Sequence, residues 1–415
     1  MSVFGAWALS LGAVSVSAAA PGRPDSTWVQ LASLPEPLES PVFALAVSPA
    51  DPGLLLVGTG SGSIYRSADG GATWTPAAKA LGRGVLAIQF NPFKAGTVLA
   101  GTRGGLWKST DAGVTWAKQA SIPNLTVRSF GFARSLTLVG ADGGLFSSRD
   151  GSTWSPYLSF APLNLSAIAV AAVNDPPKLL AGADASRGDE ALPLYVSQDG
   201  GTSWTNVKSL GSSTIVGAAA AGGVPPGGSN SRPLLVGTNA GAFISNDGGS
   251  TWGQISGLPT IDFNSAAFVT THADRFYVAS DGGGTQAGGV WTTSDSGQTF
   301  RSLAAPIGSV TAMSLTAEET PTVYSATFRP IDHAVLLWSF HDTGGTPVAP
   351  IGGIPAAAAL QATAGTVPAG VAPLSRLDLK GLLTAPEAPY LGLGLLAVLV
   401  LLAAVGLQFR RGREK

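Results

Sequence analysis

The sequence contains no cysteine, which excludes disulfide bonds, thiolate catalysis and cysteine-ligated zinc. Charged residues make up only 12% of the 415 residues, and the formal net charge of −1 provides no bulk attraction to nucleic acid. The three histidines, His272, His333 and His341, lie too far apart in the chain to indicate a metal site. We therefore expect no cofactor, no bound metal and no nucleic-acid partner.

Glycine and proline are abundant, with 55 and 29 residues respectively. At this level they interrupt helices but suit short strands joined by tight turns. Hydrophobic residues make up 45% of the chain, which is too many for a disordered protein. The composition therefore favours an all-β fold over a helical or disordered one.

Both ends of the chain differ from the middle. Residues 1–20 carry no charge and end in small residues before Pro21, which is typical of a secretory signal peptide, with a buried helix as the alternative. Residues 390–409 carry no charge and are long enough to form a transmembrane helix. Residues 410–415 are basic and are predicted to stay in the cytoplasm. Residues 347–389, rich in alanine, proline and glycine, are predicted to form a stalk.

This layout predicts a single-pass protein of a bacterial cell membrane whose middle part, residues 21–346, lies outside the cytoplasm. The excess of arginine over lysine and the absence of cysteine favour a bacterial source. Pro386 and Glu387 before the apolar run also resemble a bacterial C-terminal sorting signal, so both a retained anchor and a cleaved signal stay open.

One short pattern, SxDxGxTW, recurs through the middle of the chain at intervals of about 40 to 50 residues, the length of one propeller blade. The third copy, residues 148–154, is one residue short, and the seventh is degenerate. The aspartates of the copies are Asp69, Asp111, Asp150, Asp199, Asp247, Asp295 and Asp342. The aromatic residues that end the first six copies are Trp74, Trp116, Trp154, Trp204, Trp252 and Phe300. Seven copies predict seven blades.

The repeats also align outside the motif and predict four strands in each blade. One column in the first strand holds small residues, which indicates close packing near the axis of the ring. These residues are Ala44, Ala87, Ser129, Ala167, Gly217, Ala267 and Ala312. Residues 25–28 match the second half of the motif, so we expect the strand after them to complete the last blade and close the ring.

The motif resembles the Asp-box, or BNR, repeat of sialidases, xyloglucan hydrolases, sortilin-type receptors and photosystem II assembly propellers. The resemblance covers about residues 25–347 and implies a seven-bladed β-propeller. It says little about function, because these families share the turn and differ in chemistry. We interpret the motif residues as structural: an aspartate that accepts backbone hydrogen bonds, glycines that permit positive φ, and an aromatic side chain that packs on the blade. A metal-binding or catalytic ring of aspartates is the alternative.

Binding in a propeller usually takes place where loops converge on the mouth of the central channel, on the face opposite the boxes. We expect candidate residues there, although polar loops are common on any surface. The candidates are Arg83, Arg103, Arg128, Asp262, Asn264, Asp281, Arg329, Asp332 and His333. Arg128 stands out because its aligned positions are Phe43, Leu86, Ser166, Val216, Ala266 and Thr311. A charge within this strand needs either a partner such as Asp142 or a ligand.

A sialidase would need a tyrosine nucleophile at the mouth, and each tyrosine of this sequence falls in a strand or in the anchor. A two-carboxylate glycoside hydrolase could use Asp262 with Asp281 or Glu39. The sequence therefore predicts a membrane-anchored binding or assembly propeller, with a protein partner or a glycan at its mouth. A surface glycoside hydrolase is the alternative.

Overall fold

The computed structural model describes residues 24–122, 124–158, 165–172, 176–184, 192–222, 232–284 and 286–352. By its contacts the chain divides into two units, Met1–Thr363 and Ala364–Lys415, of which the second lies outside the described residues. The predicted signal peptide (1–20), transmembrane segment (390–409), basic tail (410–415) and nearly all of the predicted stalk also lie outside them. Among the described residues, no helix is long and apolar enough to cross a membrane.

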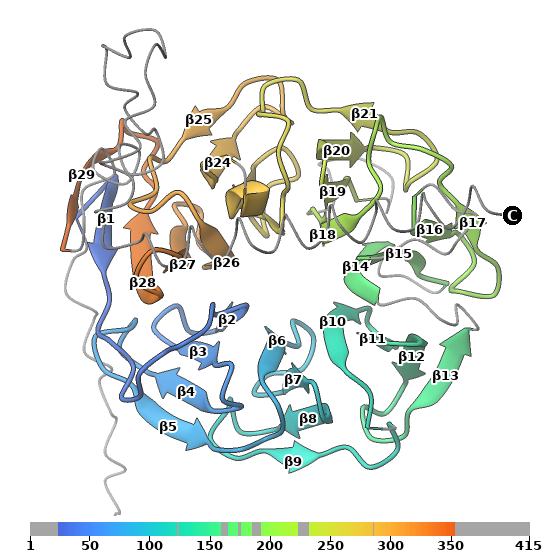
Figure 1. The fold of residues 1–415 in the computed structure, drawn as a ribbon. Helices are drawn as coiled ribbons and strands as arrows, with labels where there is room; N and C mark the ends of the chain where they lie inside the picture. The colour runs from blue at the N-terminus through green and yellow to red at the C-terminus, as the bar shows by residue number, and fades with distance from the viewer. Residues whose placement is uncertain are drawn as a thin grey trace, which may run out of the picture. The chain divides into compact units, whose positions relative to one another are not determined.

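The described residues form seven sheets arranged as the blades of a propeller, which confirms the predicted all-β seven-bladed fold (Figure 1). Blade 1 contains β2 (Ala44–Val47), β3 (Leu55–Gly58), β4 (Ile64–Ser67) and β5 (Thr75–Ala78). Blade 2 contains β6 (Val85–Phe90), β7 (Val98–Thr102), β8 (Gly105–Ser109) and β9 (Ala117–Lys118). Blades 3 and 4 contain β10 (Val127–Phe132), β11 (Thr137–Ala141), β12 (Gly144–Ser148) and β13 (Ser155–Leu158), then β14 (Leu165–Ala172), β15 (Lys178–Ala183), β16 (Leu194–Ser197) and β17 (Thr205–Asn206).

Blades 5 and 6 contain β18 (Val216–Ala221), β19 (Leu234–Thr238), β20 (Gly241–Ser245) and β21 (Gly253–Gln254), then β22 (Ser265–Phe268), β23 (Phe276–Ser280), the 3-10 turn η1 (Gly282–Gly284), β24 (Gly289–Thr293) and β25 (Arg301–Ser302). Blade 7 contains β26 (Val310–Leu315), β27 (Thr322–Arg329), β28 (Ala334–His341), β1 (Thr27–Gln30) and β29 (Val348–Ile351).

The ring is closed by the N-terminal strand, as the sequence predicts. β1 pairs antiparallel with β28, so that Trp28 lies opposite Phe340. β29 then pairs parallel with β1 and adds a fifth strand to blade 7. In Figure 1 the blue N-terminal strand lies among the orange and red C-terminal strands. The sheet thus extends past residue 346, the boundary that the repeat predicts, by the length of β29.

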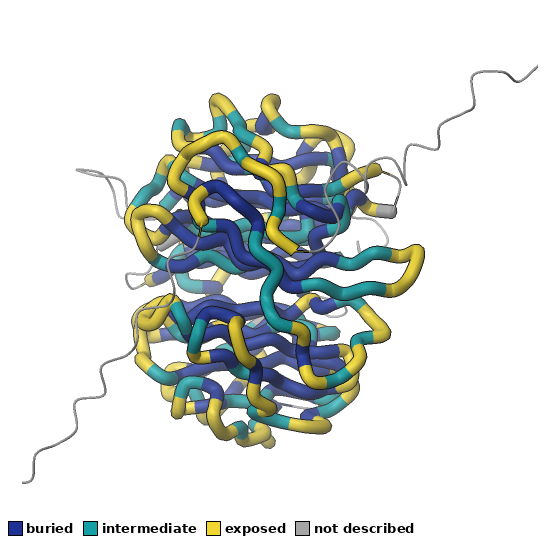
Figure 2. The backbone as a smooth tube through the Cα atoms, turned by 90° about the vertical axis from the view of Figure 1, so that its left-hand side faces the viewer, coloured by how far each residue is buried: buried dark blue, intermediate teal, exposed yellow. Residues whose placement is uncertain are grey.

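The hydrophobic core is divided into seven clusters, each between two neighbouring blades. The buried strands therefore lie inside a shell of exposed turns (Figure 2). The first strands of the blades contact one another in ring order around the axis. This crowding requires small residues where the second strand ends: a Cβ added to Gly58 would lie 2.4 Å from Val85 of the next blade.

The column of small residues in the first strands needs a correction in two blades. Register places Ala218 opposite Gly237 and Ser265 opposite Ala279, in place of the predicted Gly217 and Ala267. Residues 217–221 and 265–267 are all small, so the size of the side chains does not identify which residue belongs to the column. The residue just before the column, which is Arg128 in blade 3, is therefore Gly217 in blade 5 and Asn264 in blade 6. The sequence alignment placed Val216 and Ala266 there.

Candidate binding site at the channel mouth

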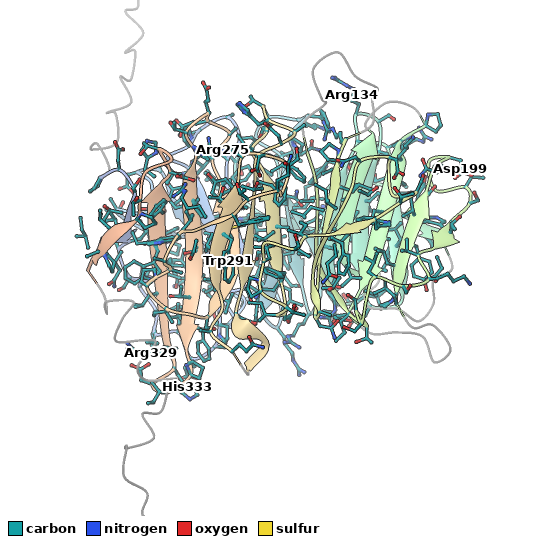
Figure 3. All side chains as sticks on the ribbon, turned by 90° about the horizontal axis from the view of Figure 1, so that it is seen from above. Arg134, Asp199, Arg275, Trp291, Arg329 and His333 are labelled. Atoms are coloured by element: carbon teal, nitrogen blue, oxygen red, sulfur yellow. The ribbon has the colours of Figure 1, made fainter. Side chains whose placement is uncertain are left out.

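The two faces of the propeller carry different loops. The box face carries the turns from first to second strand and the Asp boxes, and the mouth face carries the remaining turns and the connections between blades. Figure 3 shows Arg134, Asp199 and Arg275 on the box face, with Arg329 and His333 on the opposite, mouth face.

The aspartates of the boxes are bound within their own turns. In the second box, Ser109 Oγ donates to Asp111 Oδ1 at 2.7 Å and Thr115 Oγ1 donates to Asp111 Oδ2 at 2.5 Å. The hydrogen bond from Thr115 is the main reason why the pKa of Asp111 is lowered to about 2. The carboxylates of Asp69, Asp150, Asp199, Asp247 and Asp295 accept equivalent hydrogen bonds. No group of three or more acidic or histidine side chains among the described residues could hold a metal ion.

The aromatic residues at the ends of the boxes pack onto the blades. The indole N–H groups of Trp116, Trp204 and Trp252 donate to the glycine carbonyl three residues earlier. Trp74 instead donates to the carbonyl of Ala32, which ties the first box to the segment after β1. Phe300 contacts Phe276 edge to face. Trp154, in the shortened third box, is buried, and its N–H has no hydrogen-bond partner among the described residues.

A central cavity of about 660 Å³ is lined by the first strands of all seven blades. Its end at the mouth face is formed by one equivalent position from each blade: Phe43, Leu86, Arg128, Ser166, Gly217, Asn264 and Thr311. Among the described residues that line the cavity, the charged ones are Arg128 and Asp281. The cavity is therefore polar near the mouth and largely apolar further in, where Val47, Phe90, Phe130 and Phe268 line it.

Three polar members of this ring connect neighbouring blades. Ser166 Oγ donates to the carbonyl of Val216 at 2.8 Å, and Asn264 Nδ2 donates to that of Val310 at 3.0 Å. Thr311 Oγ1 donates to the carbonyl of Val42 at 2.6 Å. Each bond reaches the residue just before the equivalent position of the next blade. These side chains therefore hold the ring together and have a structural role whether or not a ligand binds.

Arg128 differs from the rest of the ring because it forms ion pairs. Its Nε lies 2.5 Å from Asp142 Oδ1, and its Nη1 lies 3.3 Å from Asp184 Oδ2 in blade 4. Ser129, the next residue, donates to the carbonyl of Leu165 in blade 4. It thus makes the bond between blades that Ser166, Asn264 and Thr311 make in their own blades. The sequence left open whether Arg128 has a partner such as Asp142 or binds a ligand. In the structure Arg128 pairs with Asp142. Sequence reasoning did not identify Asp184 as a second partner, because its strand lies in another repeat.

Asp262 and Asp281 lie close together on blade 6, before β22 and after β23. The backbone N–H of Gly283 donates to Asp281 Oδ1 at 2.9 Å, and a Cβ added to Gly283 would lie 3.3 Å from Asp262 Cβ. Burial, followed by the charge of Asp281, raises the pKa of the Asp262 carboxyl. Asn264 beside them has a buried Oδ1 that accepts no hydrogen bond from the part of the chain that the structure describes. Asp262 and Asp281 therefore both lie on the blade 6 side of the channel.

Arg83 and Arg103 lie on the rim at blade 2. The N–H of Arg103 contacts the carbonyl of Arg83 at 3.3 Å, so the two residues are neighbours. Both are exposed, and neither forms an ion pair with any described residue. Phe43 of blade 1 lines the cavity and is 50% exposed, which is unusual for a large apolar side chain. The repeat pattern identifies Phe43 only as a position aligned with Arg128, because a pattern of residues cannot show which side chains face solvent.

Arg329, Asp332 and His333 belong to a different feature, the hairpin of β27 and β28. Arg329 Nε donates to Asp332 Oδ1 at 2.7 Å, and His333 contacts Phe328 edge to face. None of the three lines the central cavity. At the tip, Ile331 is 82% exposed. The structure thus brings Arg128, Asn264, Asp262 and Asp281 to the channel mouth, with Arg83 and Arg103 on its rim and the hairpin residues apart from it.

The degenerate seventh box holds a buried cluster that sequence reasoning missed. Asp342 is fully buried and accepts hydrogen bonds from Tyr277 Oη at 2.6 Å and from Arg301. Arg275 Nη2 lies 3.5 Å from the same carboxylate. As the repeat predicts, Asp342 Oδ1 accepts the backbone N–H of Gly344 within its own turn at 3.0 Å, but its side-chain partners come from blade 6. The retained aspartate in a box without its serine is the signal that could have indicated this role.

The fold and its turns define the class of the protein: it is a seven-bladed β-propeller with Asp-box turns. No protein-family model matches the chain. A probable oligoxyloglucan-reducing end-specific xyloglucanase of Neosartorya fischeri is 38% identical over 79 residues, which cover 17% of this chain and 10% of that protein. This match is too short to show a family.

Solved structures resemble the propeller as a whole. An ancestral GH74 enzyme superposes with a TM-score of 0.55 and 14% identity, covering 75% of this chain and 47% of the enzyme. YCF48 bound to D1 peptide gives a TM-score of 0.53 and 16% identity over 77% of this chain and 96% of YCF48. YCF48 from Cyanidioschyzon merolae gives a TM-score of 0.51 and 16% identity over 76% of this chain and 99% of that protein. This chain thus spans about half of the GH74 enzyme, and at these identities the likeness concerns the fold.

Proposed function

We propose that this protein is a binding or assembly propeller that takes a segment of a protein partner at the mouth face. The observation that carries the proposal is the pair of neighbouring exposed arginines, Arg83 and Arg103, which form no ion pair with a described residue, on the same face as the half-exposed Phe43. Unpaired cations and an exposed apolar side chain on one face suit a partner segment that offers carboxylates and an apolar residue. We further propose that residues 390–409 hold the propeller at a bacterial membrane, on the side away from the cytoplasm.

The extent of the structural likeness supports this reading over hydrolysis. The propeller matches nearly the full length of YCF48, and one of those structures contains a D1 peptide. It matches less than half of the GH74 enzyme. A chain with one propeller is therefore more similar in size to the peptide-bound protein.

The test is crosslinking of the full-length protein in its own membranes, followed by identification of the captured partners. The variant Arg83→Glu with Arg103→Glu reverses both rim charges without touching a hydrogen-bonded side chain. We expect this variant to capture at least about tenfold less of the partner, because each introduced glutamate repels an acidic segment.

The matched control is Lys94→Glu with Arg149→Glu, which makes the same change in net charge at exposed residues of the opposite, box face. This control should capture the partner as well as the unmodified protein does. Equal capture by the two double variants would reject the rim as the docking surface.

A second candidate function, glycoside hydrolysis, is favoured by one observation: the half-buried Asp262 carboxyl, whose pKa is raised by burial and by the charge of Asp281. A raised pKa suits a general acid that works with a second carboxylate. Sugar release from xyloglucan oligosaccharides that disappears in Asp262→Asn would support this function. No release by the unmodified full-length protein would reject it for that substrate.

A further inference from the structure

The third Asp box differs from the other boxes because it is one residue shorter. In the eight-residue boxes at Trp116, Trp204 and Trp252, the indole N–H donates to the carbonyl of the box glycine at 3.1, 3.1 and 3.0 Å. That bond keeps the N–H satisfied while the ring is packed against the blade. The shorter turn changes where this carbonyl and this N–H lie.

In the third box the two groups no longer meet. The carbonyl of Gly151 accepts a hydrogen bond from Lys108 Nζ at 2.6 Å. Trp154 is only 4% exposed, and its Nε1 is buried with no hydrogen-bond partner among the described residues. A buried donor without an acceptor costs free energy, so a ligand that supplies an acceptor would gain from it.

Trp154 lines a cavity of about 180 Å³ on the box face between blades 2 and 3, which we name the blade 2–3 pocket. Four cations line the same pocket: Lys94, Lys108, Arg134 and Arg149. The acidic residue in the lining is Asp150, and its carboxylate already accepts hydrogen bonds from Ser148 Oγ and from the N–H groups of Ser152 and Thr153.

The positive charge of the pocket is not neutralised. None of the four cations forms an ion pair with a described residue. Burial and then repulsion by the charge of Lys94 lower the pKa of Lys108, and the charge of Asp150 offsets this in part. An anion between them would relieve this repulsion.

We propose that the blade 2–3 pocket binds a phosphate group, whose oxygens accept hydrogen bonds from Trp154 Nε1 and from the surrounding lysines and arginines. Arginine and lysine are the side chains that most often bind phosphate, and the indole N–H can only donate. A cavity of 180 Å³ has the volume of roughly six liquid waters, which suits a phosphate group and not a whole nucleotide. The phosphate can belong to a free ion or to the headgroup of a lipid, since both present the same oxygens.

The first experiment titrates inorganic phosphate into full-length protein labelled with ¹⁵N-tryptophan, at an ionic strength held constant with chloride. We expect the indole N–H resonance of Trp154, identified by its loss in Trp154→Phe, to move and saturate. The indole resonances of Trp116, Trp204 and Trp252 should stay in place, because their N–H groups are already bonded. An unmoved Trp154 resonance, or an equal shift with chloride alone, would overturn the proposal.

Variants then test the cations. Lys94→Gln with Arg149→Gln removes two exposed charges and should weaken phosphate binding by about tenfold or more. Arg83→Gln with Arg103→Gln removes the same charge from the mouth face and should leave phosphate binding unchanged. Equal weakening by both double variants would mean general electrostatic attraction and would reject the site.

A length variant tests the role of the shortened turn itself. Inserting one glycine after Gly151 restores an eight-residue box and should give the Trp154 N–H a carbonyl partner within the turn. We expect the inserted variant to keep its melting temperature and to bind phosphate more weakly. Undiminished phosphate binding in this variant would contradict the role assigned to Trp154.

Vesicles identify the source of the phosphate. The full-length protein is floated with phosphatidylcholine vesicles that contain phosphatidic acid, with phosphatidylcholine alone as the control. Binding to the first that is lost in the Lys94→Gln, Arg149→Gln variant supports a lipid phosphate. Binding of inorganic phosphate without vesicle binding supports a soluble phosphate ligand.

Discussion

At the scale of single residues, aspartate has two different physical roles at equivalent positions of the repeats. In the first six boxes the carboxylate lies near the surface and accepts hydrogen bonds from its own turn. In the seventh, Asp342 accepts the N–H of Gly344 in its own turn, but it is fully buried and also contacts Arg275, Arg301 and Tyr277 of the neighbouring blade. The same side chain thus stabilises a turn in the first six boxes and, in the seventh, joins two blades as well.

We therefore predict that Asp342→Asn destabilises the protein strongly. The substitution leaves two arginines facing a neutral side chain, and losing one partner of a buried ion pair costs about 3–5 kcal/mol. Urea unfolding followed by tryptophan fluorescence measures this loss.

The control is Asp332→Asn, which breaks the pair with Arg329 at a carboxylate side chain that is 47% exposed. Breaking this pair should cost less than about 1 kcal/mol. Similar losses in the two variants would show that burial of Asp342 does not decide its contribution.

At the scale of elements, one strand decides whether the ring is closed. β1 carries Trp28, which is fully buried, lies 5.1 Å from the ring of Phe340 and donates to the carbonyl of Leu303 at 2.6 Å. It therefore binds blade 7 through the sheet and blade 6 through its side chain. β29 outside it exposes Val348 and Ile351 by more than half and buries little.

Trp28→Ala should lower the free energy of unfolding by about 3–5 kcal/mol, because it empties a buried site between blades 6 and 7. Val348→Ala, on the exposed strand next to it, should change the free energy by no more than about 0.5 kcal/mol. Thermal melting of both variants tests this difference, and a small effect of Trp28→Ala would mean that β1 is dispensable for closure.

At the scale of the whole molecule, the repeated boxes determine how the protein responds to acid. Hydrogen bonds, mainly from the hydroxyl four residues later, lower the pKa values of Asp111, Asp199 and Asp295 from 3.8 to about 2. Because the pKa is lower in the folded state, these groups contribute stability that is complete above the unfolded value. That contribution is lost as the pH falls through about 2.

We expect the free energy of unfolding to be nearly constant from pH 7 to about pH 4 and to fall steeply between about pH 4 and pH 2. Urea unfolding across this range measures the profile. Replacing all three of these aspartates by asparagine should reduce the steepness of the fall. A profile that declines mainly between pH 7 and pH 5 would contradict the assignment to the boxes.

Much of this molecule follows from local patterns in its sequence. The spacing of the boxes predicts seven blades, and residues 25–28 predict the closing strand, because box turns and blade strands depend on residues close together in the chain. The small-residue column was misplaced at Gly217 and Ala267, because the first strands of blades 5 and 6 hold runs of small residues in which size does not identify the column. A shift of the register by one residue leaves such a run unchanged.

The chemistry of the surfaces depends on contacts between blades. The sequence identified Arg128 as unusual and named Asp142 as a partner, but Asp184 joins the pair only through packing of blades 3 and 4. The sequence shows that the third box is short. Only the structure shows that the carbonyl of Gly151 bonds Lys108 and that the N–H of Trp154 has no acceptor among the described residues. The repeat thus determined the fold by itself, because its turns are local. Tertiary structure decided which charges are neutralised, because their partners come from other repeats.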